Sequence, residues 1–177
     1  MFLAVVLDAF SRKVVGWAMA DHLQASLAVQ ALLQALAARR PPPGLIHHSD
    51  RGTQYACAEY RAILQQHGLQ ASMSWVGNPY DNAKAESFMA TLKREQIDGR
   101  RYRDLAEARA DIGSFIETVY NTDRLHSALG YRSPTEFEAW HRTSAGDAAR
   151  DQGLRAARAQ PGLNGDNAEV TLQIVSP

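Results

Sequence analysis

The sequence predicts an α/β fold with a mixed sheet flanked by helices. Two observations predict it: short runs of Val, Leu and Ile alternate with longer segments whose apolar residues recur at helical spacing, and clusters of Gly, Pro, Asn and Asp separate them. The chain has 177 residues, 45% hydrophobic and 21% charged, which suits one globular domain with a sizeable core.

The first elements follow from these patterns. Residues 2–7 form a continuous apolar run typical of a buried strand, and residues 13–20 return as the second strand of a hairpin. Leucines at helical spacing predict a helix over 25–38, which the prolines at 41–43 end. A short strand at 44–47 follows.

The second half of the chain is predicted to be mostly helical. Its elements are a helix over 55–67, a strand over 69–73, helices over 83–96 and 104–120, and a last helix that begins at Ser133. Gly68 stands where a C-cap is needed, and Asn82 is the expected N-cap of the third helix. Ser133, with Glu136 three residues later, predicts a capping box.

Charge and composition exclude several classes. Lys+Arg and Asp+Glu both number 19, so the formal net charge is zero and bulk positive charge does not hold this protein to DNA or membranes; a local basic patch stays open. The single cysteine, Cys57, allows neither an intramolecular disulfide nor a multi-cysteine zinc site. The apolar run near the N-terminus is too short to span a bilayer. A cytoplasmic location is favoured.

Composition also divides the chain. Residues 143–177 contain no Phe, Tyr or Trp and are rich in Ala, Gly, Asp, Asn and Gln. We therefore expect one domain over 1–142, followed by a disordered tail over 143–177, with only 170–175 as a candidate for order.

Two carboxylates stand where α/β folds carry chemistry. Asp50 follows the strand at 44–47, and Glu86 lies in the first turn of a helix, 35 residues further on. One crossover separates them and can bring them together. Two such acids repel unless a cation lies between them. Mg²⁺ takes one or two protein carboxylates and leaves positions for phosphate oxygens, and a pair of such ions can align a phosphodiester substitution.

Lys93 lies seven residues after Glu86, so the two are only about 20° apart around the helix axis. Ala90 lies between them on the same face and is small enough for a bulky ligand to approach. This face can hold a metal ion at one end and a phosphate group at the other.

These residues belong to a set of motifs. They are HSDRG at 48–52, GNPYDNA at 77–83, ESF at 86–88, TLK at 91–93, YN at 120–121, Arg124, HSALGY at 126–131 and SP at 133–134. In this order they resemble the integrase core of insertion-sequence transposases, within the DDE superfamily that includes retroviral integrases. The resemblance extends over residues 2 to 140 and implies a ribonuclease H-like mixed sheet.

The resemblance implies a DDE-type polynucleotidyl transferase that cuts transposon ends and joins them to target DNA, with two Mg²⁺ or Mn²⁺ ions. Asp50 corresponds to the second catalytic acid and Glu86 to the third, and both are metal ligands in the family. Lys93 corresponds to a basic residue that contacts DNA near the reacting phosphate. The resemblance also implies a homo-oligomer that acts on DNA in the bacterial cytoplasm and is associated with the nucleoid when bound to DNA. It implies no membrane partner.

Four further residues are candidate DNA contacts with open alternatives. Asn78 either contacts DNA or shapes its loop. Arg94 belongs to a basic run over 93–103 that is either a phosphate-contacting surface or a solvated face. Arg124 and His126 either touch DNA or hold the turn between two helices.

The chain departs from the family in one respect. The first catalytic Asp is expected on a strand that precedes the hairpin, and the chain begins inside the hairpin. We therefore expect that the first strand of the fold is missing and that its absence leaves a gap in the sheet. We also expect an N-terminally truncated core without the family's N-terminal helical DNA-binding segment. We interpret Asp8, the only acid before Asp21, as structural.

Plainer alternatives accompany each assignment. Asp50 can cap a turn, Glu86 can be an ordinary helix-start acid, and Lys93 can be solvated. His47 and His48 with Asp50 suggest a zinc site, but no third ligand follows at good spacing, and adjacent strand residues point to opposite faces.

Three functions remain open. The first is a transposase catalytic core. The second is a catalytically inactive remnant that only binds DNA or associates with full-length transposase, because the first Asp is absent. The third is a ribonuclease H-like nuclease that hydrolyses without joining.

Overall fold

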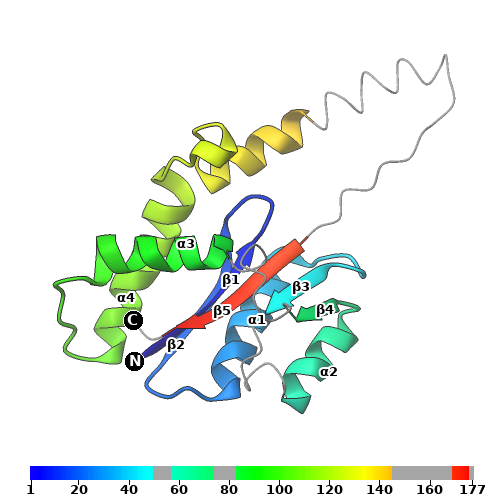
Figure 1. The fold of residues 1–177 in the computed structure, drawn as a ribbon, viewed down its shortest axis with the longest axis horizontal. Helices are drawn as coiled ribbons and strands as arrows, with labels where there is room; N and C mark the ends of the chain where they lie inside the picture. Colours follow the sequence, from blue (N-terminus) through cyan, green and yellow to red (C-terminus); the bar gives the residue numbers. More distant parts are fainter. Residues whose placement is uncertain (50–56, 74–82, 145–168, 176–177) are drawn as a thin grey trace, which may run out of the picture.

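The protein was analysed as a computed structural model that describes residues 1–49, 57–73, 83–144 and 169–175, the last segment and residue 73 by their main chain only. A five-stranded mixed sheet has the order β2-β1-β5-β3-β4, with helices on both faces (Figure 1). The α/β class predicted from the sequence is confirmed.

The first half of the chain contributes four strands of the sheet and two helices. Its elements are β1 (Phe2–Asp8), β2 (Val14–Ala20), α1 (Ala25–Arg39), β3 (Ile46–Ser49), α2 (Ala58–Gln66) and β4 (Gln70–Met73). β1 and β2 are antiparallel, whereas β3 and β4 are parallel. Gly68 adopts φ +66 just after α2, as its predicted C-cap role requires.

The second half is helical and includes two π-helical segments. Its elements are α3 (Ala83–Leu92), η1 (Lys93–Ile97), α4 (Leu105–Ser114), η2 (Phe115–Asp123), η3 (Ser127–Leu129), a helix over 134–144, and the strand β5 (Glu169–Val175). η1 continues α3, and η2 continues α4, so each pair forms one continuous helical rod. Ser133 and Glu136 form the predicted capping box, at 2.9 and 3.2 Å.

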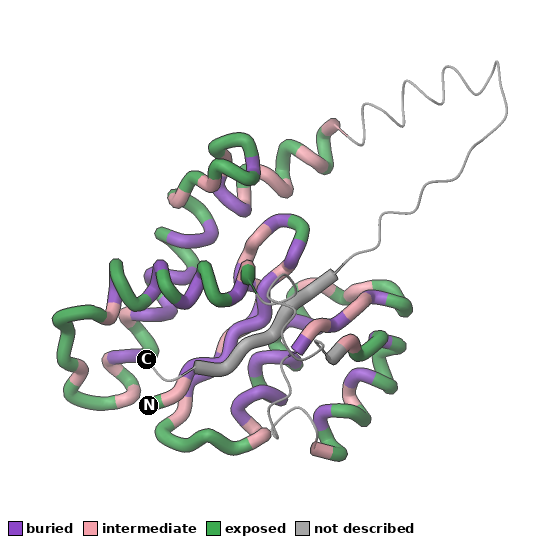
Figure 2. The backbone as a smooth tube through the Cα atoms, viewed as in Figure 1, coloured by how far each residue is buried: buried purple, intermediate pink, exposed green. Residues whose placement is uncertain are grey.

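β1 is buried on both faces because its side chains alternate between two cores. Leu3, Val5 and Leu7 join the cluster under α3, α4 and η2, whereas Ala4 and Val6 join the cluster under α1 and α2. Figure 2 shows the resulting buried stripe along β1, with exposed positions on the outer sides of the helices. This pattern explains why the sequence of this strand is continuously apolar.

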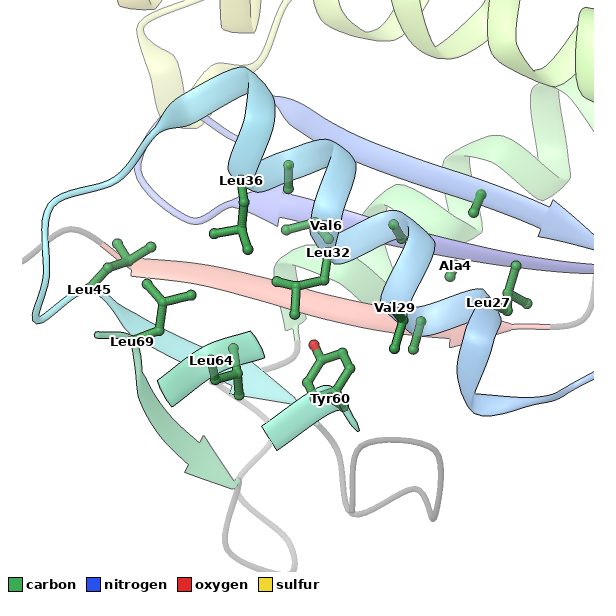
Figure 3. Close-up of a cluster of buried hydrophobic side chains, with 14 residues drawn as sticks. Ala4, Val6, Leu27, Val29, Leu32, Leu36, Leu45, Tyr60, Leu64 and Leu69 are labelled. Atoms are coloured by element: carbon green, nitrogen blue, oxygen red, sulfur yellow. The ribbon is translucent and has the colours of Figure 1, made fainter. Parts of the chain in front are cut away.

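The cluster beneath α1 sets the position of one helical layer. Leu27, Leu32 and Leu36 of α1 point towards the sheet, where Tyr60 and Leu64 of α2 meet them (Figure 3). The helix lies very close to β2: a Cβ on Gly16 would be 2.3 Å from the Ala31 carbonyl oxygen. Glycine at this position therefore sets the distance between sheet and helix.

β5 differs from the expectation of a disordered tail. It lies between β1 and β3, antiparallel to β1 with Val5 opposite Gln173, and parallel to β3 with Ser49 opposite Leu172. The sequence of this segment alternates apolar and polar residues, as a strand in a sheet does. The sheet thus has a strand where we expected a gap, and this strand comes from beyond residue 142, the expected end of the domain. The helix over 134–144 also crosses this expected domain boundary. Residues 145–168 lie outside the described residues.

Asp8 has the structural role that we assigned to it. Its Oδ1 accepts the main-chain N–H groups of Phe10 and Ser11 at 2.9 and 3.0 Å, which forms the hairpin turn. Its other oxygen lies 3.2 Å from Arg39, which also pairs with Glu138 of the helix over 134–144. The hairpin, the end of α1 and the last helix are joined at this point.

The central position of β5 can be tested with proline. Each N–H of a strand paired on both sides bonds to a neighbour, so Leu172→Pro leaves a carbonyl of β1 or β3 unpaired and costs about 1–3 kcal/mol. We expect the melting temperature to fall by about 2–4 °C per kcal/mol, measured by circular dichroism. Gln152→Pro, in the connecting segment, is the control. Equal melting of the two variants would contradict the central pairing of β5.

Candidate active site and nucleic-acid interface

The helix α3 presents one exposed polar face. Glu86, in its first turn, Ala90 and Lys93 at its end are all exposed, and the opposite side buries Phe88 and Leu92 in the core. Among the described residues, no ion pair involves Glu86 or Lys93. The spacing predicted from the sequence is therefore realised: an unpaired carboxylate and an unpaired amine share one solvent-facing side, with a small residue between them.

α3 packs across β5 and β1 (Figure 1), and Glu86 lies in its first turn on the exposed side. β3 runs beside β5 and ends at Ser49, directly before Asp50. Asp50 itself lies outside the described residues, as does Asn78. The meeting of Asp50 with Glu86, and any contact of Asn78 with DNA, stay predictions.

The end of β3 is fixed from the other side of the sheet by a buried histidine. The His47 Nε2 lies 2.7 Å from the Tyr60 hydroxyl of α2, and His47 is 1% exposed. Burial, with a smaller contribution from the charge of His48, lowers the pKa of His47 to about 4, so its ring is neutral at physiological pH. His48 is half-buried, so the two neighbours differ in exposure as alternation predicts.

This arrangement gives no support to a zinc site. Within residues 1–49, 57–73 and 83–144, no three His, Cys, Asp or Glu side chains gather as a metal-binding group. The Nε2 atom of His47 is engaged by Tyr60, so one of its two ring nitrogens is already in use.

The basic run over 93–103 is largely neutralised by neighbouring acids. Arg94 lies 3.1 Å from Glu95, Arg100 lies 2.8 Å from Asp111, and Arg103 lies 3.1 Å from Glu107. The pair that Arg103 makes is a fully exposed one of the kind that contributes little to stability. The run is thus not a surface on which every positive charge is unpaired. A DNA phosphate could bind Arg94 only in competition with the carboxylate of Glu95.

A main-chain clamp joins the hairpin to η2. The side-chain amide of Asn121 accepts the N–H of Val14 and donates to the carbonyl of Val14, both at 2.9 Å. Asn121 therefore pairs with the start of β2 much as a neighbouring strand would, and it is buried there. Tyr120 beside it packs edge-on against Phe88 of α3, with ring centroids 4.7 Å apart.

Arg124 and His126 follow directly after this clamp. Arg124 pairs with Glu95 of η1, and the His126 ring lies edge-on to Tyr120 at 5.2 Å. The main chain of His126 holds the turn, because its N–H donates to the Arg132 carbonyl at 3.1 Å and its carbonyl accepts the Tyr131 N–H at 2.9 Å. The turn-holding alternative is thus supported for the main chain of His126, whereas its side chain stays available for a contact.

Comparison with known proteins bears on this arrangement. Residues 1–79 match a family model described as an integrase core domain, and residues 67–134 match a second with the same description. The chain is 50% identical over 141 residues to the transposase for insertion sequence element IS904 of Lactococcus lactis, which covers 80% of this chain and 56% of the relative. The chain belongs to the integrase-core family of insertion-sequence transposases.

A second relative agrees with this assignment. The transposase InsF for insertion sequence IS3A of Escherichia coli is 46% identical over 138 residues, covering 78% of this chain and 48% of the relative. The integrase core studied here thus spans about half the length of the curated relatives that it matches.

Solved structures confirm the ribonuclease H-like fold. The HTLV-2 integrase catalytic core domain in complex with magnesium aligns with a TM-score of 0.55 at 15% identity over 75% of this chain and 81% of that one. The catalytic core domain of BIV integrase aligns with a TM-score of 0.55 at 19% identity over 80% and 89%. At such identities, the likeness concerns the fold alone.

Sequence reasoning missed two partners of this integrase core. Nothing in the local sequence around Asn121 signals that its amide pairs with a strand 107 residues earlier. Nor does the local sequence signal that Glu95 forms an ion pair with Arg124. A usable signal did exist for β5, the alternation over 170–175. Within the described residues, no helix is both long and apolar enough to cross a membrane.

The buried histidine predicts a pH dependence. The pKa of His47 is about 4 in the folded protein and 6.5 in the unfolded chain. Between these two pH values the unfolded chain binds more protons than the folded protein, so stability falls as pH is lowered. The loss amounts to at most about 3 kcal/mol by pH 4, and this contribution is constant above pH 6.5.

Urea unfolding of the wild type and of His47→Gln from pH 8 to pH 4.5 isolates the effect, since carboxylate titrations are common to both proteins. The amide retains a hydrogen-bond partner for Tyr60. We expect the difference between the two stabilities to shrink as pH falls below 6.5. A difference that does not vary with pH would contradict the neutral buried state of His47.

Proposed function

We propose that this chain is the catalytic core of a DNA transposase that cleaves and joins phosphodiester bonds with divalent metal ions. The observation that carries the proposal is the exposed face of α3, with Glu86 and Lys93 unpaired among the described residues. This helix packs on β5, which is the neighbour of the strand that leads to Asp50. The family membership of the chain supports the same activity.

Asp50 and Glu86 are the residues that would hold Mg²⁺ or Mn²⁺. The donor set fits such ions, because carboxylate oxygens are their preferred protein ligands and the exposed Glu86 leaves room for water and phosphate. When bound, the ions would activate the attacking oxygen and stabilise the leaving one. The N-terminal end of α3 carries a positive partial charge, which suits a carboxylate in the first turn of the helix.

The remaining candidates would position DNA. Lys93 lies about two turns along the same face and is free to meet a phosphate near the reacting bond. Arg94 and Arg124 both meet Glu95, so their contact with DNA requires that the phosphate replace this carboxylate. Asn78 completes the proposed set. We further propose action as a homo-oligomer on transposon ends and target DNA in the bacterial cytoplasm, with relatives named as dimeric and trimeric forms in support.

The proposal is tested on the full chain with Mn²⁺ and labelled duplexes that carry the ends of the element. We expect cleavage or joining, and we expect Asp50→Asn and Glu86→Gln each to reduce it by more than about 100-fold, since even second-shell changes at metal sites cost about 10–100-fold. Glu59→Gln is the matched control, because Glu59 is also an exposed acid in the first turn of a helix, α2.

Retained activity in Asp50→Asn or Glu86→Gln would contradict the metal assignment. Loss of activity in Glu59→Gln would indicate a general effect on folding. The gel also separates joined products from hydrolysed ends, which distinguishes strand transfer from simple nuclease action.

One observation favours a second candidate, a core that binds DNA without cutting it. The central strand β5 contains Glu169 but no aspartate, whereas the resemblance places the first catalytic Asp on a strand before the hairpin. If the full chain binds DNA in a fluorescence-anisotropy titration and gives no cleavage at any Mn²⁺ concentration, this second candidate replaces the first.

A further inference from the structure

We propose that Arg12, Arg124 and His126 form a binding site for one phosphate group of the DNA backbone, beside the polar face of α3. Arg12 belongs to none of the contacts assigned above. The proposal deepens the proposed function and rests on it for the identity of the ligand, but binding at this site needs neither metal ions nor cleavage.

Arg12 is held in place by the hairpin turn. It adopts φ 60, a left-handed conformation uncommon for residues other than Gly, Asn and Asp, and its N–H donates to the Asp8 carbonyl at 2.8 Å. Because Asp8 also fixes the N–H groups of Phe10 and Ser11, the turn has little freedom. The turn therefore fixes the main chain of Arg12, and the residue is half-buried there.

The Asn121 clamp brings Arg12 to η2. Val14, two residues after Arg12, is bonded through both its main-chain groups to the amide of Asn121. Asn121 in turn is followed by Arg124 after two residues and His126 after four. The clamp therefore brings the main chain of the hairpin turn next to the segment that carries Arg124 and His126, and the His126 ring lies edge-on to Tyr120.

The electrostatics of this junction favour an anion. Among the described residues, Glu95 is the one acid that forms an ion pair with any of these three side chains. Of the three, its partner is Arg124. The His126 Nε2 is buried without a hydrogen-bond partner in the described part of the chain. An unpaired buried nitrogen beside two guanidinium groups is costly unless a ligand oxygen satisfies it.

The titration of His126 agrees with this geometry. Burial, then the charges of Arg12 and Arg124, lower the pKa of His126. The same two arginines lie near enough to Tyr120 to oppose the rise that burial gives to its pKa. A phosphate at the junction would offset both positive charges, and protonated His126 would donate to it, as charge-assisted hydrogen bonds require.

The first arm of the test uses inorganic phosphate and the full chain. The pKa of the His126 ring is followed by NMR in the presence of EDTA, with His126→Gln to assign the signal. We expect phosphate to raise this pKa in a saturable manner. In Arg12→Asn we expect the pKa to be higher before phosphate is added and phosphate affinity to fall about 5–10-fold.

Asparagine is chosen because it tolerates the left-handed conformation and so preserves the turn. Arg12→Lys keeps the charge and is expected to retain most of the affinity. Arg61→Ala is the matched control, an exposed arginine of α2 under the other face of the sheet. If phosphate leaves the pKa of His126 unchanged, or if Arg12→Asn behaves as Arg61→Ala does, the proposal is overturned.

The second arm uses duplex DNA and identifies the source of the phosphate. Each phosphate contact contributes about 0.9 to the slope of log K against log salt, so we expect Arg12→Asn to flatten the slope by about one and Arg61→Ala to leave it unchanged. Inorganic phosphate binding with an unchanged DNA slope would mean a free-anion site and would refute the DNA assignment. Because the salt slope is measured in EDTA and needs no cleavage, a flatter slope in Arg12→Asn is expected even where the metal assignment fails, which separates the two proposals.

Discussion

The main-chain pairing of β5 is the interaction on which the rest of the structure depends. In the order β2-β1-β5-β3-β4, the hairpin and the parallel pair β3–β4 do not bond to each other, and β5 joins them. α3, which carries Glu86, packs on β1 and β5, whereas the strand that leads to Asp50 pairs with β5 and β4. The helix that carries Glu86 and the strand that leads to Asp50 are therefore joined through a strand from the far end of the chain.

A second constraint acts around the edge of the sheet. The amide of Asn121 substitutes for a neighbouring strand at Val14, so that the long rod of α4 and η2 is tied to the hairpin. Because Tyr120 packs on Phe88, the same rod also fixes α3. The hairpin turn, α3 and the residues after η2 are thus joined by side-chain contacts. Such ties would suit the proposed function, in which this surface positions the DNA backbone.

Local patterns predicted what local physics determines. The apolar run of β1, the capping box of Ser133 and the left-handed Gly68 depend on near neighbours, and all three are confirmed. The pairing of β5 and the reach of Asn121 depend on residues more than 100 positions away, and no sequence window contains both partners. Of the candidate site, the sequence predicted the shared face of Glu86 and Lys93, whereas the pairing of Arg124 with Glu95 follows only from the packing of η1 against the segment after η2.

The distribution of paired and unpaired charges separates structural from functional side chains on this surface. Arg94, Arg100 and Arg103 pair with acids of their own neighbourhood, where a DNA phosphate would have to compete with a carboxylate already in place. Glu86 and Lys93 have no such partner among the described residues. Exposed ion pairs contribute little to stability, so a folded chain can leave such charges unpaired at little cost. Their position on one helical face agrees with the proposed function, which needs a carboxylate for a cation and an amine for a phosphate.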